Sequence, residues 1–267
     1  MDLFSWWQYD FMRTALWAVL LLVPLLSLLG TMVVSNRMSF FSDALGHSAL
    51  TGVAIGVVAG VTRYEWVMLA FAVVFALLMN RIRHARLAST DTVIGVFSAV
   101  GVALGLLLLS RSGSFAGYQT LLIGDILSVS PGDLWVIGGA LLLTVVIWLG
   151  CFNGFAAVSI SPAVARSKGI PVRLLDDLFV VLVAVVVMLS IRWVGLLLIN
   201  AMLILPAAAA RNVARSLRSF HLLSLLFGLF AGVLGLWLSY YHAVSTGPTI
   251  ILVLGVLFFG TFFMRKK

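Results

Sequence analysis

The 267-residue chain has little charge and almost no cysteine. Charged residues make up 10% of it and hydrophobic residues 63%, a balance that no soluble globular domain of this size needs. A single cysteine, Cys151, excludes an internal disulfide and a thiolate cluster. The chain also lacks a Gly-Lys dipeptide, and so it lacks the G-x-x-x-x-G-K-[ST] phosphate loop. Cysteine chemistry and nucleotide hydrolysis by that loop are therefore excluded, and the chain is not expected to be an enzyme.

Long apolar runs are what the sequence does contain. About 20 apolar residues are needed to cross the hydrocarbon of a bilayer. The runs predict an all-α polytopic membrane protein with eight or nine spans, because the third run is short and the sixth and seventh are nearly continuous. No internal repeat or linker interrupts them, so we expect one transmembrane domain over 1–267. The candidate spans are 12–33, 41–60, 66–80, 91–110, 132–152, 174–191, 193–210, 221–241 and 248–264.

The cations between these runs predict the topology. A net charge of +8 does not indicate nucleic acid here, because most cations form short clusters between spans. If the C-terminus is cytoplasmic and successive loops alternate between the two sides of the membrane, all but four of the 17 Lys and Arg residues lie on the cytoplasmic side. We therefore expect a multi-pass protein of the cell (inner) membrane with a cytoplasmic C-terminus and an external N-terminus. The four exceptions are Arg13, Arg63, Arg111 and Arg192.

The stretch SFFSDALGHSALTGVAIGVVAG, residues 39–60, places an acid and an imidazole in a predicted span. Asp43 and His47 are four residues apart, so a helix presents both side chains on one face. An aspartate at the centre of a spanning helix costs about 2.5–3.5 kcal/mol, and such a residue normally faces a cavity, a partner or a transported species. Both side chains are ligands for first-row divalent metals. We predict a weak transport site of two donors per chain, completed by a symmetry mate or water; the alternative is a bond to a neighbouring helix.

Four further features are candidates with simpler alternatives. Asp91 opens the fourth span and is interpreted as a helix cap. Asp125 lies in a half-apolar stretch between Arg111 and Pro131, which we interpret as a short surface or re-entrant helix on the outer side. There Asp125 guides cations toward the entrance, docks a delivery protein, or is a plain surface carboxylate. Asn200 precedes Pro206, which is expected to kink its span, and it either bonds the freed backbone or lines the substrate path. Gly52 and Gly56, four apart, predict that the second span is packed inside the bundle.

Five stretches together resemble the integral-membrane subunit of ABC transporters for zinc, manganese or ferrous iron, the ABC-3 permease family. The first is the basic turn, aspartate, histidine and glycine-rich helix of RMSFFSDALGHSALTGVAIG. The others follow in the family's order and spacing over most of the chain. They are DTVIGVFSAVGVALG from Asp91, LIGDILSV from Leu122, VGLLLINAMLILPAAAAR from Val194 and SYYHAVSTGPTIIL from Ser239.

The resemblance implies one half of a type II ABC importer. Two copies, a homodimer or a paralogous heterodimer, would form the path in the lipid bilayer. Cytoplasmic ATP-binding subunits would drive it, and an extracytoplasmic metal-binding protein would deliver the ion. No cofactor is held permanently, and the divalent metal is cargo.

The resemblance also places the ATPase contact in the cytoplasmic loop at about 153–173. Pro162 and Gly169 are typical of the start and end of a short helix there. The resemblance assigns four residues of this loop to the contact with the ATPase: Pro162, Ala165, Arg166 and Gly169. The sequence departs from the family by lacking an acidic residue near the start of this loop.

Two other functions remain open from the residues themselves. A gradient-driven metal carrier or channel would need the same pair of ligands and no ATPase. A cobalamin or siderophore permease would need a wide pore rather than a small polar pair. Asp and His suit Zn²⁺, Mn²⁺ and Fe²⁺ alike, so the sequence does not name the metal.

Overall fold

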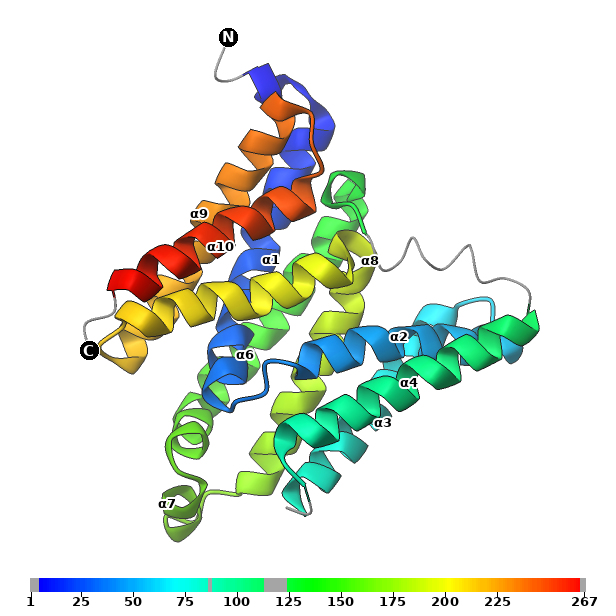
Figure 1. Cartoon of the computed structure of the whole chain (residues 1–267), viewed down its shortest axis with the longest axis vertical. Helices are drawn as coiled ribbons and strands as arrows, with labels where there is room; N and C mark the ends of the chain where they lie inside the picture. The colour runs from blue at the N-terminus through cyan, green and yellow to red at the C-terminus, as the bar shows by residue number, and fades with distance from the viewer. Residues whose placement is uncertain (1–4, 86–87, 113–123, 265–267) are drawn as a thin grey trace. The chain divides into compact units, whose positions relative to one another are not determined.

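A computed structural model describes residues 5–85, 88–112 and 124–264 of the chain. Within these ranges the secondary structure is helical throughout (Figure 1). The predicted short outer helix falls largely on residues outside the described ranges, and the described part that follows is the 3₁₀ turn η3. In chain order the elements are η1 (Ser5–Gln8), α1 (Asp10–Ser35), α2 (Phe41–Val58), α3 (Tyr64–His84), α4 (Thr90–Ser112), η3 (Ile126–Ser128), α6 (Pro131–Ile160), α7 (Pro162–Ser167), α8 (Val172–Val213), α9 (Leu217–His242) and α10 (Thr246–Met264).

Eight of the described helices are long and apolar enough to cross a membrane. They confirm the all-α, multi-pass class, and α8 contains both the sixth and the seventh predicted span. The end of α6 was predicted too early. No residue before Pro162 breaks that helix, so it continues to Ile160 and residues 153–160 are helix rather than loop. Ser161 then adopts an extended backbone, as the residue before a proline favours.

The break in α8 lies at Gly195, eleven residues before Pro206, where the sequence predicts a kink. Gly195 has φ 73° and ψ 163°, a conformation essentially restricted to glycine, whereas Pro206 lies within the helical part. Gly124, with φ 54°, lies against this break, because a Cβ there would overlap the backbone of Gly195. The segment before η3 therefore packs against the point where α8 is interrupted.

The chain forms two compact units, and α6 and α8 each contribute a part to both. In unit 1, small residues of α9 allow close approach to α1 and to α10. A Cβ at Gly228 would meet Val23 and Ser27 of α1, and one at Gly235 would meet Ile250 of α10. Unit 1 comprises Met1–Val34, Gly124–Ile147 and Trp193–Lys267; unit 2 comprises Ser35–Ile123 and Trp148–Arg192.

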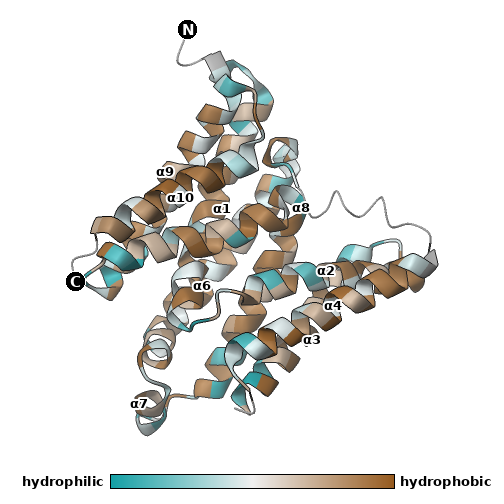
Figure 2. Ribbon diagram, in the orientation of Figure 1, coloured by the Kyte–Doolittle hydropathy of each residue, from teal (hydrophilic) through white to brown (hydrophobic). Residues whose placement is uncertain are grey.

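In unit 2, α2 lies beside both α3 and α4 (Figure 1). A Cβ at Gly52 would stand 2.7 Å from the Cα of Met68, and one at Gly56 would meet Tyr64, so α3 is held against α2. The predicted packing role of these two glycines is confirmed. Most of α2 is buried, and it carries more hydrophilic positions than α10 does (Figure 2). A polar pair on such a helix needs a local cavity or partner.

Long apolar faces of α6 and α10 remain exposed. Examples are Trp135 and Leu149 on α6, and Leu252 and Phe263 on α10. The colouring in Figure 2 is hydrophobic along most of both helices. These faces suit lipid, where the helix satisfies its own backbone hydrogen bonds.

Candidate functional site

The site begins at the tight turn before α2. Arg37 has φ 55°, and the N–H of Phe41 donates to the carbonyl of Met38 at 2.9 Å. Met38 itself is buried, with 1% of its surface exposed. This turn fixes the start of α2 and thereby places Asp43 in its first helical turn, where a carboxylate interacts favourably with the helix dipole.

Asp43 and His47 come together as the spacing predicts. Nε2 of His47 lies 3.6 Å from Oδ1 of Asp43, and about 40% of each side chain is exposed. Both line a cavity of about 540 Å³ between α2 and α4. The rest of the lining is mainly small or apolar and comes from α4, including Gly95, Ala99 and Ala103. The pair is therefore accessible to a small ion from one side and packed against helices on the other.

Asp91 also lines this cavity, from the first turn of α4. Asp91 lies in the first helical turn, where its carboxylate interacts favourably with the helix dipole as the sequence predicts. The hydrogen bond that caps the helix is made by Ser89 instead, whose Oγ accepts the N–H of Thr92 at 3.1 Å. The placement of Asp91 in the lining of the cavity was not predicted from the sequence.

The donor set of this cavity suits weak binding of a divalent cation. Across the parts of the chain that the structure describes, no group of three or more His, Cys, Asp or Glu side chains has the geometry to hold a metal ion. Asp43 and His47 thus offer two donors from one chain, an oxygen and an imidazole nitrogen. An ion held by two protein ligands can leave more readily than one in a closed structural site, which usually has four.

The other two predicted path residues belong to unit 1. Asp125 is exposed, and its Oδ1 accepts the N–H of Leu127 at 3.0 Å, which caps η3. Asn200 is half-buried in the part of α8 that follows Gly195. The structure thus places Asp43 with His47, whereas Asp125 and Asn200 belong to other local environments.

The coupling segment folds as a short helix. Pro162 occupies the first turn of α7, and Oγ of Ser161 accepts the N–H of Val164 at 3.4 Å. Gly169 follows the helix with φ 75°, which confirms the predicted start and stop. Ala165 is fully buried and Arg166 is exposed, so α7 has one face anchored in unit 2 and another open to a partner.

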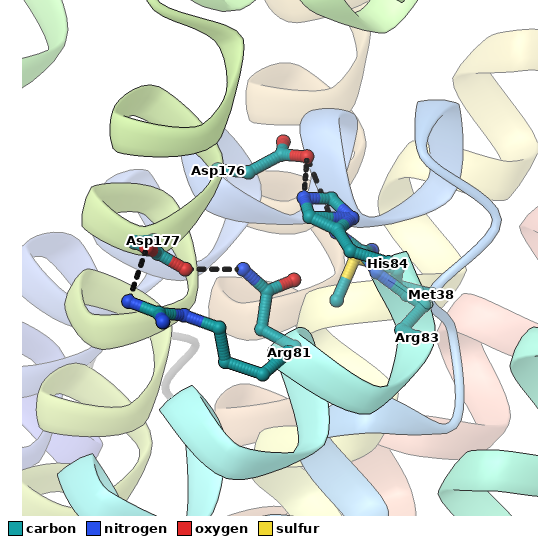
Figure 3. Close-up of polar contacts among 7 residues, drawn as sticks. Met38, Arg81, Arg83, His84, Asp176 and Asp177 are labelled. Carbon is teal, nitrogen blue, oxygen red and sulfur yellow. Dashed lines mark hydrogen bonds and ion pairs between the residues drawn. The ribbon is translucent and has the colours of Figure 1, made fainter. Parts of the chain in front are cut away.

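A polar cluster joins the end of α3 to the start of α8, and the sequence did not predict it (Figure 3). Oδ2 of Asp176 lies 3.1 Å from Nε2 of His84 and 3.4 Å from Nη2 of Arg83. The neighbouring Asp177 accepts from Nδ2 of Asn80 at 2.7 Å and pairs with Arg81 at 3.7 Å. From the sequence, the basic end of α3 is interpreted as a topology signal. In the structure its partners are the two aspartates of α8.

Comparison with known proteins gives matches over nearly the whole chain. The ABC 3 transport family matches residues 8–265. The manganese import system permease protein ScaB of Streptococcus parasanguinis is 32% identical over 261 residues, covering 97% of this chain and 92% of that protein. The manganese transport system membrane protein MntC of Halalkalibacterium halodurans is 28% identical over 261 residues, covering 97% and 89%. The solved structure of PsaBC from Streptococcus pneumoniae in complex with Fab is 30% identical, with a TM-score of 0.83 and coverage of 97% and 93%.

The fold and these matches define the class of the protein as a multi-pass permease of the ABC transporter type. Since the family match extends over residues 8–265, the chain belongs to the ABC 3 transport family.

Proposed function

We propose that the chain is the permease subunit of an ATP-driven importer of divalent transition metal ions. The observation that carries the proposal is the Asp43–His47 pair, 3.6 Å apart on one face of α2 and open to a cavity. A carboxylate and an imidazole in a helix long enough to span a membrane are a donor set for a metal ion rather than for a large organic chelate.

Manganese is the first metal to test. The relatives ScaB and MntC are named for manganese import and transport. A carboxylate ligand suits Mn²⁺, and the imidazole extends the donor set to Zn²⁺ and Fe²⁺. Two donors from one chain do not distinguish these metals. We therefore assign much of the selectivity among them to an extracytoplasmic protein that delivers the ion.

Energy for import is assigned to separate ATP-binding subunits. The chain has no Walker-type phosphate loop, and α7 presents Arg166 and Val164 on an exposed face next to a buried anchor. We place α7 on the cytoplasmic side with the C-terminus, in accord with the distribution of Lys and Arg. Two permease copies, identical or paralogous, complete the path between them.

Reconstitution into proteoliposomes tests this function against a gradient-driven carrier. The chain alone and the chain with its ATP-binding subunits are compared for uptake of manganese, zinc and ferrous iron. The proposal predicts metal transport that requires both the ATP-binding subunits and ATP. Equal uptake by the chain alone under an ion gradient would overturn it.

A further inference from the structure

Arg83 connects three segments of unit 2. Its side chain is 13% exposed and projects from the last turn of α3. Nη2 lies 3.4 Å from Oδ2 of Asp176 on α8, while Nη1 donates to Sδ of Met38 in the turn before α2 (Figure 3). One guanidinium thus touches both the start of α8 and the turn that positions α2.

The Asp176 end of this contact is tied closely to α7. Four residues separate α7 from α8, and within them the N–H of Ile170 returns to the carbonyl of Ala165 at 3.1 Å. The N–H of Leu175, which precedes Asp176, donates to the carbonyl of Pro171 at 3.1 Å. Ala165 is fully buried, and these two backbone hydrogen bonds tie the connecting residues to α7 and to the first turn of α8.

Met38, the other residue that Arg83 contacts, is bonded to the start of the helix that carries Asp43 and His47. The carbonyl of Met38 accepts the N–H of Phe41, the first residue of α2, and Asp43 follows two residues later. Met38 is buried, with 1% of its surface exposed. Arg83 therefore contacts the residue whose carbonyl is bonded to the start of the helix that carries Asp43 and His47.

Space for such a shift exists beside the guanidinium. A cavity of about 380 Å³ is lined by Arg83, Asp176 and Asn36, and by Val158 and Pro162 at the junction of α6 and α7. Arginine is suited to this position because its planar fork holds donors for two acceptors at once, whereas the ammonium of lysine is a single point charge.

We propose that Arg83 is a positioning residue that couples α7 to the Asp43–His47 helix. The inference rests on the proposed function, in which α7 contacts the ATP-binding subunit and α2 holds the metal. Movement of α7 on ATP binding or hydrolysis passes through Asp176 and Arg83 to Met38, and so alters the metal pair. Loss of Arg83 uncouples ATP hydrolysis from transport.

A matched control is available near the start of α3 and about halfway along α8. Nη1 of Arg192 on α8 pairs with Oε1 of Glu65 on α3 at 2.8 Å. This ion pair also joins α3 to α8, but it lies far along both helices from Asp176 and Met38. Arg192→Met removes an ion pair between the same elements without touching the proposed connection.

The experiment uses the whole transporter, with its ATP-binding subunits, in proteoliposomes. Manganese ions transported per ATP hydrolysed are measured for the unmodified transporter and for the Arg83→Met, Arg83→Lys, Asp176→Asn, Met38→Leu and Arg192→Met variants. An effector typically changes the affinity of a second site by about 5- to 150-fold. Taking that as a scale, we expect Arg83→Met to lower the ratio of ions transported to ATP hydrolysed about tenfold. Asp176→Asn acts in the same direction, Arg83→Lys gives an intermediate ratio, and Arg192→Met keeps the unmodified ratio.

Met38→Leu keeps the test decisive if Arg83→Met does not assemble. The two side chains have similar volumes, so this change removes the sulfur acceptor with little disturbance of packing. A lowered ratio supports the connection, and an unmodified ratio overturns it. Equal ratios for Arg83→Met and Arg192→Met also overturn the inference while ATP-dependent transport by the unmodified protein stands. If the unmodified transporter itself shows no ATP-dependent metal transport, it is the proposed function that fails.

Discussion

Gly105 of α4 lies so close to Thr51 of α2 that a Cβ at the glycine would stand 2.9 Å from the Thr51 backbone nitrogen. The hydroxyl of Thr51 donates to the carbonyl of Gly101, one turn earlier on α4. These contacts hold α2 against α4 alongside the cavity that Asp43 and His47 line. The shape of the candidate site therefore depends on the absence of a side chain at Gly105.

Gly105→Ala is expected to destabilise the protein, because its methyl group would overlap the α2 backbone. Overpacking of this kind costs about 1–3 kcal/mol. The measurement is the thermal unfolding midpoint of the purified full chain in detergent. Gly95→Ala on the same helix is the control, since nothing lies within 4 Å of its Cβ position. A lower midpoint for Gly95→Ala than for Gly105→Ala would contradict the packing described.

Gly195→Ala is expected to lower stability for a conformational reason. The backbone of Gly195 has φ 73° and ψ 163°, and a side chain in such a region adds about 1–3 kcal/mol of strain. The control is Gly255→Ala on α10, because nothing lies within 4 Å of a Cβ at that position and its backbone φ is not positive. Unfolding midpoints of the two variants are compared. Should Gly195→Ala unfold at the same temperature as the unmodified protein, α8 is not broken at this residue.

Arg166→Glu is expected to weaken the contact with the ATP-binding subunit. Arg166 is exposed on α7, so charge reversal there alters the partner surface while leaving buried Ala165 in place. The amount of ATP-binding subunit that co-purifies with the permease is measured. Arg63→Glu, at the start of α3 and assigned to the outer side, is the control and keeps the co-purified amount unchanged. An equal loss for both variants, or for neither, argues against α7 as the docking helix.

Single cysteines test the predicted orientation. In a Cys151→Ser background, Val61→Cys is expected to react with a membrane-impermeant thiol reagent added to intact cells, because Val61 is exposed at the predicted outer end of α2. Ser167→Cys at the end of α7 is expected to react after the cells are opened. The reverse pattern would place α7 and the coupling segment outside, contrary to the proposal.

Much of the architecture follows from apolar runs and local signals. The spans, the inward packing of Gly52 and Gly56, and the short helix between Pro162 and Gly169 are all readable from neighbouring residues. The Asp43–His47 spacing predicts a shared helical face, and the structure brings the two side chains within 3.6 Å. Each of these features depends on interactions within one helix or between helices that are adjacent in sequence.

The features that the sequence did not predict depend on contacts distant in the chain. Gly195 rather than Pro206 interrupts α8, and Gly124 packs against that interruption. Asp176 and Asp177 meet the basic end of α3 because α3 and the first part of α8 lie side by side in opposite directions. Ser89 rather than Asp91 makes the capping hydrogen bond of α4, and Asp91 lines the cavity with residues of α2, which the helix-start pattern does not decide.

The central claim is that Asp43 and His47 bind the transported metal. Its most direct test is manganese transport by the assembled transporter carrying Asp43→Asn or His47→Ala. Asp10→Asn is the matched control, because Asp10 also lies in the first turn of an apolar helix but pairs with Arg13 of that helix. The account predicts that both site variants assemble with the ATP-binding subunits yet lose metal transport, while Asp10→Asn transports normally. Normal transport by either Asp43→Asn or His47→Ala would contradict it.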